Sequence, residues 1–208
     1  MTPARLRGLY AITDELLIPE SAFAASIEQA LSGGTSIIQY RDKSGNEAKR
    51  FEQASALRSL CNEYRASLII NDDITLAKAV AADGVHLGED DLSIEQARLI
   101  LGNNAIIGIS CYNQLQLGTR AQTAGADYVA FGAVFTSPTK PHARSASCEL
   151  ISEAKSQLDI PVCAIGGIDK SNVESVIEAG ADMTALISGL FNEPDIRLTA
   201  EHISRLFD

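Results

Sequence analysis

The stretch Ala124-Gly-Ala-Asp-Tyr-Val-Ala-Phe-Gly132 contains the structural unit that repeats along the chain. An amphipathic pattern over residues 114–124 predicts a helix, which the glycine ends, and the run 128–131 predicts the strand that follows. The phrase Ala-Gly-Ala-Asp returns at residues 179–182, again between a predicted helix and a predicted strand. A helix stop that leads into a strand, met more than once, indicates an α/β fold.

Short apolar runs alternate with longer amphipathic runs over the whole length, and the short runs predict eight strands. The strands cover residues 9–13, 36–40, 68–71, 84–87, 106–110, 128–131, 162–166 and 184–188. Helical patterns lie between them, for example at 22–31, 47–64, 94–101, 114–124, 171–179 and 196–207. Eight β/α units favour a (β/α)8 TIM barrel, as one domain over residues 1–208. A doubly wound open sheet is the alternative, but no GxGxxG follows the first strand.

The composition is that of an acidic globular protein. Of its 208 residues, 46% are hydrophobic, and 27 Asp and Glu against 17 Lys and Arg give a formal charge of -10. This charge repels nucleic acid and anionic membranes, so we expect neither as a partner. No apolar run is long enough for a signal-peptide core or a membrane span, which predicts a cytoplasmic protein. The four cysteines lack metal-ligand spacing, which predicts free and mostly buried thiols.

Polar side chains gather at the carboxyl ends of nearly all the predicted strands, where both candidate architectures bind ligands. Gln39, Arg41 and Lys43 stand at alternate positions at the end of strand 36–40, so their side chains point the same way. Each cation taken alone is typical of a solvated strand end, but together they indicate a site for an anion. Lys140, after strand 128–131, is a further candidate cation for a diphosphate.

Two carboxylates, Asp72 and Asp91, follow the third and fourth predicted strands. Each taken singly is typical of a turn or a helix cap. With oxygen ligands alone and no His or Cys nearby, the pair suits Mg²⁺, a hard cation that keeps waters and bridges substrate phosphates. Gly166-Gly167 and Ser188-Gly189, at the ends of the last two strands, are candidate N–H donors for a monophosphate. The sequence therefore predicts a site for two small phosphorylated ligands.

These motifs, taken in order, resemble those of a known family. They are Gln39-Tyr-Arg-Asp-Lys43, Ile70-Asn71-Asp72, Gly84-Val-His-Leu-Gly88 with Asp91, Gly108-Ile-Ser110, Asp127-Tyr-Val-Ala-Phe-Gly132 with Ser137-Pro-Thr-Lys140, and Ala164-Ile-Gly-Gly167. Over residues 9–190 the chain is similar to the thiamine phosphate synthase (thiamine-phosphate pyrophosphorylase) family.

The resemblance implies an enzyme that joins 4-amino-2-methyl-5-hydroxymethylpyrimidine diphosphate to 4-methyl-5-(2-hydroxyethyl)thiazole phosphate and releases diphosphate and thiamine phosphate. It implies a dissociative reaction in which Mg²⁺, Arg41, Lys43 and Lys140 act electrostatically on the departing diphosphate. By the same resemblance, the residues that contact the pyrimidine diphosphate are Gln39, Arg41, Lys43, Asn71, Ser110 and Lys140. Those that contact the thiazole phosphate are Ser137, Thr139, Gly167, Ile187 and Ser188, and those that bind Mg²⁺ are Asp72 and Asp91.

The chain departs from the family pattern at two places. Cys111-Tyr112 follows Ser110 where the family often has a small residue and His, and Ser137 stands where Thr is usual. We expect His86, inside strand 84–87, to be a structural residue that is packed and hydrogen-bonded at the barrel wall. The long loop 136–146 is either a mobile lid over the diphosphate or a plain solvated loop.

Two other functions stay open at this point. A thiazole tautomerase of related fold binds the thiazole phosphate alone and needs a catalytic His near the fifth strand, while a non-catalytic barrel would only hold thiamine phosphate. The synthase is preferred because Asp72, Asp91 and the cations after the second strand are present and that His is absent. Tyr10 and Thr13 are further candidates for the pocket wall, and the alternative is a buried tyrosine with its hydroxyl bonded locally. A homo-oligomer is compatible with the sequence.

Overall fold

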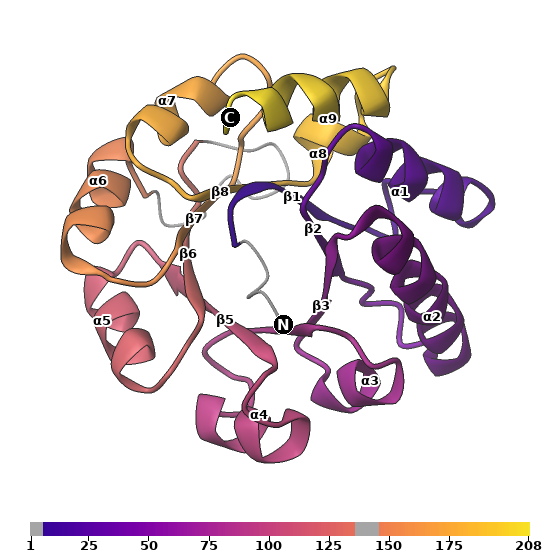
Figure 1. Cartoon of the computed structure of the whole chain (residues 1–208), viewed down its shortest axis with the longest axis horizontal. Helices are drawn as coiled ribbons and strands as arrows, with labels where there is room; N and C mark the ends of the chain where they lie inside the picture. Colours follow the sequence, from indigo (N-terminus) through magenta and orange to yellow (C-terminus); the bar gives the residue numbers. More distant parts are fainter. Residues whose placement is uncertain (1–5, 136–145) are drawn as a thin grey trace.

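The strands follow one another around a closed parallel barrel in chain order. The computed structural model describes residues 6–135 and 146–208, and β1 closes the ring by pairing with β8. Figure 1 shows the ring of strands with the helices outside it. The predicted (β/α)8 barrel is confirmed, and the open sheet is excluded. The strands are β1 (Gly8–Ile12), β2 (Ile37–Tyr40), β3 (Ser67–Asn71), β4 (Gly84–Leu87), β5 (Ile106–Tyr112), β6 (Tyr128–Gly132), β7 (Val162–Ile165) and β8 (Met183–Leu186).

Helices connect successive strands, and polar side chains cap several of them. Ser93 forms a capping box with Gln96 at the start of one helix, and Asn46 caps another by accepting the N–H of Lys49. The helices are η1 (Glu20–Ala22), α1 (Phe23–Ser32), α2 (Glu47–Tyr64), α3 (Ile74–Ala79), α4 (Ile94–Leu101), α5 (Leu115–Thr123), α6 (Cys148–Gln157), α7 (Val173–Glu178), α8 (Ser188–Phe191) and α9 (Ile196–Arg205).

Alternate residues of each strand point to opposite sides of the barrel wall, and two apolar clusters result. The larger cluster lies between the strands and the helices and includes Leu9, Ile38 and Val129. The smaller cluster fills the lumen with side chains from Tyr10, Ile12, Ile37, Ile69, Ile106, Tyr128, Ala130, Cys163, Met183 and Ala185. Because both faces of each strand are buried, the strands form continuous apolar runs in the sequence.

The repeated Ala-Gly-Ala-Asp phrase ends a helix and fastens the amino-terminal rim of the barrel. Its glycines, Gly125 and Gly180, have φ values of 91° and 99°, which a residue with a Cβ adopts only under strain. Each aspartate that follows accepts an N–H from the start of the preceding strand and pairs with a cation of the helix that leads into that strand. These contacts are Asp127 to Ile107 N (2.7 Å) and Arg98 (2.6 Å), and Asp182 to Val162 N (2.8 Å) and Lys155 (2.7 Å). Asp83 repeats the arrangement with Leu68 N (2.7 Å) and Arg58 (2.6 Å).

The predicted element boundaries are close to the observed ones, with one difference that affects the site. The eighth strand, predicted over 184–188, ends at Leu186, and Ser188 is the first residue of α8. Ile187 adopts φ -117° and ψ -91°, which breaks the strand before the helix starts. The helix predicted over 196–207 ends at Arg205.

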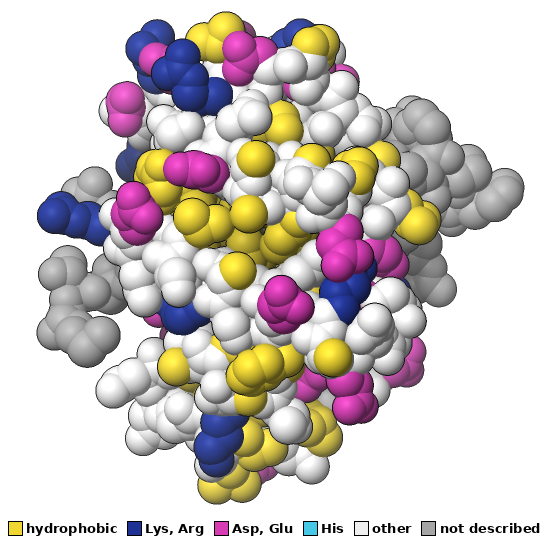
Figure 2. Space-filling view, turned by 90° about the vertical axis from the view of Figure 1, so that its right-hand side faces the viewer, with side chains coloured by type: hydrophobic (Ala, Val, Ile, Leu, Met, Phe, Trp, Pro, Cys, Tyr) yellow, Lys and Arg dark blue, Asp and Glu magenta, His cyan; other side chains and the backbone are white. Residues whose placement is uncertain are grey.

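The surface mixes both signs of charge. On the face drawn in Figure 2, Lys and Arg side chains occur in small groups beside acidic ones, with hydrophobic side chains between them. Within residues 6–135 and 146–208, no helix is long and apolar enough to cross a membrane. The four cysteines are free thiols, and all but Cys148 are buried, as predicted.

Candidate active site

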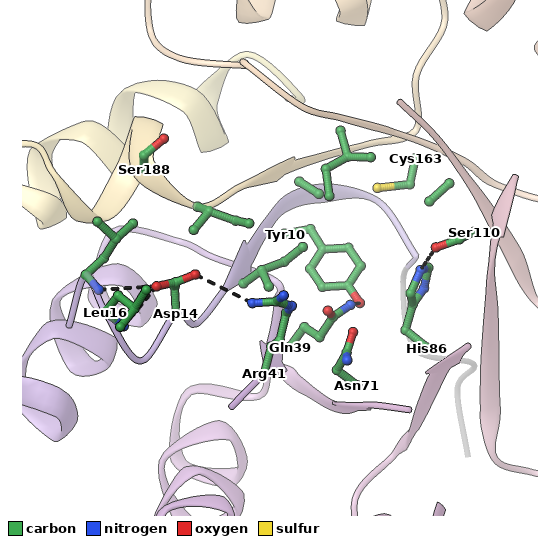
Figure 3. Close-up of a pocket in the computed structure, with 16 residues that line it drawn as sticks. Tyr10, Asp14, Leu16, Gln39, Arg41, Asn71, His86, Ser110, Cys163 and Ser188 are labelled. Atoms are coloured by element: carbon green, nitrogen blue, oxygen red, sulfur yellow. Dashed lines mark hydrogen bonds and ion pairs between the residues drawn. The ribbon is translucent and has the colours of Figure 1, made fainter. Parts of the chain in front are cut away.

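A pocket of about 510 Å³ opens at the carboxyl ends of the strands, where the sequence predicts a site. Figure 3 shows Arg41, Gln39 and Asn71 on one side of it and His86 with Ser110 on another. The lining residues are Tyr10, Ile12, Asp14, Leu16, Leu17, Gln39, Arg41, Asn71, His86, Ser110, Ala130, Cys163, Ile165, Ala185, Ile187 and Ser188. A mostly apolar pocket with a few convergent polar groups is typical of a small-molecule site.

The end of β2 places a cation at the pocket. Gln39 points into the lumen and is 3% exposed, and Arg41 lines the pocket two residues further on, as the alternation predicts. Thr13 fixes the Arg41 backbone, because its hydroxyl accepts the Arg41 N–H at 2.8 Å and donates to the Arg41 carbonyl at 3.0 Å. The guanidinium lies 3.5 Å from a carboxylate oxygen of Asp14. Thr13 therefore positions Arg41 and does not itself line the pocket.

Two carboxylates and a cation lie together beside the pocket. Lys43 Nζ donates to Asp72 at 2.5 Å, and Asp72 adopts a left-handed φ of 61°. Partial burial raises the pKa of Asp91, and the neighbouring Asp72 carboxyl raises it further, while the N–H of Gly88 at 2.7 Å and Lys43 lower it. Two oxygen-donor carboxylates that repel each other fit a hard divalent cation such as Mg²⁺. Among the described residues no group of three or more His, Cys, Asp or Glu could hold a metal, so further ligands would come from substrate or water.

A continuous chain of hydrogen bonds crosses the lumen below the pocket mouth. Gln39 Nε2 donates to the Tyr10 hydroxyl at 2.7 Å, and the hydroxyls of Tyr10 and Tyr128 are 2.8 Å apart. Tyr128 is 2.9 Å from His86 Nδ1, and His86 Nε2 is 2.8 Å from Ser110 Oγ. Burial lowers the pKa of His86 to about 4, so the ring is neutral at pH 7. His86 is packed and hydrogen-bonded as predicted, but in the lumen, where it also lines the pocket.

The ends of β7 and β8 form the other side of the pocket. Gly166 and Gly167 have φ values of 99° and 67°. A Cβ on Gly167 would lie 2.7 Å from the carbonyl oxygen of Phe135, so the backbones approach too closely for a side chain. Ile187 and Ser188 line the pocket at the start of α8. The backbone of the two glycines and of the start of α8 therefore lies close to the pocket, at the strand ends where barrels often bind a phosphate.

The structure brings together many of the predicted site residues. Gln39, Arg41, Asn71, Ser110, Ile187 and Ser188 line the pocket. Lys43, Asp72, Asp91 and Gly167 are described but do not line it, and the first three form the charged group next to it. Three predicted residues, Ser137, Thr139 and Lys140, lie outside the described residues, as does the predicted lid except for Ala146.

Sequence reasoning missed two kinds of lining residue. The loop after β1 contributes Asp14, Leu16 and Leu17, and its position after a strand end was a signal that could have identified Asp14. Small apolar lumen residues such as Ala130 and Cys163 carry no such signal, because they look like any buried strand position.

Comparisons with known proteins agree on one family. The sequence model described as "Thiamine monophosphate synthase" matches residues 9–190. A thiamine-phosphate synthase of Thioalkalivibrio sulfidiphilus is 50% identical over 207 residues, which cover 100% of this chain and 98% of that protein. A thiamine-phosphate synthase of Nitrosococcus oceani is 53% identical over 195 residues, covering 94% of this chain and 90% of that protein.

The fold comparison leads to the same group of proteins. The solved structure of a thiamine phosphate pyrophosphorylase from Pyrococcus furiosus superposes with a TM-score of 0.89 at 38% identity. The match covers 100% of this chain and 98% of that one.

Proposed function

This chain belongs to the thiamine monophosphate synthase family, and we propose that it joins 4-amino-2-methyl-5-hydroxymethylpyrimidine diphosphate to 4-methyl-5-(2-hydroxyethyl)thiazole phosphate, forming thiamine phosphate and diphosphate. The observation that carries the proposal is the meeting of Arg41, Lys43, Asp72 and Asp91 at one edge of an otherwise largely apolar pocket. That edge suits a diphosphate, and the apolar interior suits a flat ring.

The pyrimidine diphosphate would lie with its ring in the largely apolar interior, where a few polar side chains meet the ring's polar atoms, and with its diphosphate toward the charged edge. Gln39, Asn71 and Ser110 supply the polar groups that orient the ring. Arg41 and Lys43 supply positive charge for the diphosphate, and Lys140 is proposed as a third cation on the strength of the sequence alone.

Asp72 and Asp91 would hold Mg²⁺, which when bound neutralises charge on the diphosphate and so makes it a better leaving group. Lys43 Nζ already donates a hydrogen bond to Asp72 at 2.5 Å. Lys43 would therefore stay close to the oxygens of the departing diphosphate. Thr13 holds the Arg41 backbone in place through two hydrogen bonds. Arg41 could therefore stabilise the negative charge on the departing diphosphate without first having to move.

A dissociative reaction needs stabilisation of the leaving group more than it needs a nucleophilic side chain. The described lining residues agree with that requirement. Burial raises the pKa of the pocket thiol, Cys163, far above its ordinary value, so the thiolate nucleophile is absent at neutral pH. Burial lowers the pKa of His86 to about 4, and its two ring nitrogens are bonded to the hydroxyls of Tyr128 and Ser110, so at neutral pH it is not an imidazolium that could act as a general acid. The tautomerase alternative needs a histidine near β5, and that strand ends in Cys111 and Tyr112 instead.

The thiazole phosphate would bind on the opposite side of the pocket. Gly167, Ile187 and Ser188 are the described residues proposed to contact it, and Ser137 and Thr139 are proposed from the sequence. The thiazole nitrogen would then face the methylene carbon that the diphosphate leaves.

The test is to incubate the purified protein with both substrates and Mg²⁺ and to measure thiamine phosphate. Asp72→Asn and Asp91→Asn should each lower kcat/KM by about 100-fold or more and raise the Mg²⁺ concentration needed for half-maximal rate. Asp90→Asn, an exposed neighbour, is the matched control and should leave both unchanged. No product from the wild type with any divalent cation would refute the synthase function, and full activity of both site variants would refute the metal assignment.

A further inference from the structure

The hydrogen-bonded chain across the lumen has a direction. The amide nitrogen of Gln39 can only donate, so the hydroxyl oxygen of Tyr10 accepts. The Tyr10 hydrogen must then go to Tyr128, and the Tyr128 hydrogen must go to His86 Nδ1. Since a neutral imidazole carries one N–H, that hydrogen is on Nε2 and is donated to Ser110 Oγ. In this direction the hydroxyl hydrogens of Tyr10 and Tyr128 and the ring N–H of His86 are all used, and the hydrogens left over are the Ser110 hydroxyl hydrogen at one end and the second N–H of Gln39 at the other.

The opposite direction conflicts with the position of the Gln39 amide. If Ser110 donated to His86 and the bonds ran toward β1, Tyr10 would accept from both of its neighbours and keep its own hydrogen without a partner. Tyr10 is 1% exposed and Tyr128 is fully buried, so that hydrogen could not reach water. An unsatisfied buried donor costs about 1–3 kcal/mol. Reversal therefore requires the Gln39 amide to turn over at the same time.

We propose that Tyr10, Tyr128 and His86 are positioning residues that fix the polarity of the pocket, making Ser110 a hydrogen-bond donor and the Gln39 amide oxygen an acceptor. This inference rests on the proposed function, since the ligand it describes is the pyrimidine. An acceptor on β2 and a donor on β5 match an aminopyrimidine, which offers an exocyclic N–H on one edge and a ring nitrogen on another. None of the three positioning residues needs to touch the ligand through its hydroxyl or ring nitrogen.

The proposed polarity selects against the corresponding 4-oxopyrimidine. Its carbonyl oxygen would face the Gln39 amide oxygen. Both atoms are hydrogen-bond acceptors, so neither would have a donor inside the pocket. Gln39 cannot simply turn over, because the Tyr10 hydroxyl that it supports is held by Tyr128. Removing the Tyr128 hydroxyl releases that constraint, since Tyr10 could then donate to a turned Gln39.

The first test measures the His86 tautomer directly in the wild-type protein. The chain has three histidines, so with ¹⁵N-labelled histidine the His86 signals are assigned by their loss in His86→Gln. We expect a protonated Nε2 and an unprotonated Nδ1 at pH 7. A proton on Nδ1 would mean that the chain runs the other way and would overturn the proposal, whatever the enzyme assay gives.

The second test measures selectivity by titration calorimetry with the 4-aminopyrimidine monophosphate and its 4-oxo counterpart. The wild type should bind the amino compound at least about 30-fold more tightly, and Tyr128→Phe should reduce that ratio about tenfold or more. Tyr40→Phe is the matched control, because the Tyr40 hydroxyl is bonded to Gln53 outside the lumen, at 3.0 Å. Its ratio should equal that of the wild type.

The outcomes separate the two ideas. An unchanged ratio in Tyr128→Phe would refute the role of the chain in selectivity. If the wild type binds neither pyrimidine, the proposed function fails, and the direction of the chain is still decided by the His86 tautomer.

Discussion

Replacing Lys49 by Met should destabilise the protein from outside the pocket. Lys49, in the first turn of α2, pairs with Asp42 at 2.8 Å, and the Asp42 side chain is only 2% exposed. Asp42 lies between Arg41 and Lys43, so the pair anchors the segment that carries both cations. Removing the lysine would leave a buried carboxylate whose remaining described partner is Ser44, through its N–H at 2.7 Å and its side chain.

The size of the effect follows from burial. Breaking a buried ion pair by removing one partner costs about 3–5 kcal/mol. Because the Ser44 bond persists and the Lys49 side chain is 21% exposed, we expect the lower end, about 3 kcal/mol. For a chain of this length, each 1 kcal/mol lowers Tm by about 2–4 °C, so the expected fall is about 6–12 °C.

The loss should depend on pH in a defined direction. Burial alone raises the pKa of Asp42, but hydrogen bonds from Lys49 and Ser44 outweigh it and hold the pKa below its ordinary value of 3.8. A carboxyl with a lowered folded-state pKa contributes stability above its ordinary pKa and loses it as the pH falls through the lowered one. In the variant the Asp42 carboxylate has no cation beside it, so it takes up a proton at a higher pH than in the wild type, and protonation removes the cost of the buried charge. The difference in the free energy of unfolding between the two proteins should therefore be largest near neutral pH and smaller in acid.

The assay is urea unfolding of both proteins at neutral pH and near pH 4, followed by far-UV circular dichroism. Lys170→Met is the matched control, since it removes the exposed pair with Glu193, in which the lysine side chain is 57% exposed. That variant should lose less than about 1 kcal/mol. A Lys49→Met loss no larger than the control's, or a gap that widens in acid, would refute the account.

Three further results are expected. Gly108→Ala should destabilise the barrel by about 1–3 kcal/mol in urea unfolding, because its Cβ would lie 2.0 Å from the Tyr128 ring; an unchanged midpoint would contradict this. Iodoacetamide in the native state should label Cys148 alone, as mass spectrometry of peptides would show, since the other three thiols are buried and burial raises the pKa of each. Asp14→Asn should raise KM for the pyrimidine diphosphate less than about fivefold, because its partly exposed contact with Arg41 is 3.5 Å long; a hundredfold rise would be inconsistent with so weak a pair.

The barrel could be predicted from the sequence because its rhythm is local. Each strand is a short apolar run, and turn residues such as Gly125 and Gly180 mark where a helix must stop. The predicted end of the eighth strand was wrong because Ile187 extends the apolar run and Ser188 follows it with no turn residue between, and only the backbone at Ile187 shows that a new helix begins there. Periodicity does not determine that change of dihedral angle.

The polar half of the site was predictable for a similar reason. Gln39 and Arg41 alternate along one strand end, and the barrel turns that alternation into a common direction. The lumen contacts were not predictable, because Tyr10, Tyr128 and His86 come from three strands and read individually as core residues. Their meeting depends on the stagger of the closed barrel, which pairs residues far apart in the sequence.

The aspartates that bind the strand starts at the amino-terminal rim affect how the sequence of such a protein can change. Asp83, Asp127 and Asp182 bind strand starts at the rim opposite the polar pocket residues that end the strands, such as Arg41, Asn71 and Ser110. A substitution at one of them should act on unfolding, while a substitution in a loop after a strand should act on binding. Selection can therefore change the loops that bind ligands without changing the contacts that hold the strand starts together. A designer could likewise graft new loops onto the same barrel and keep these aspartate contacts.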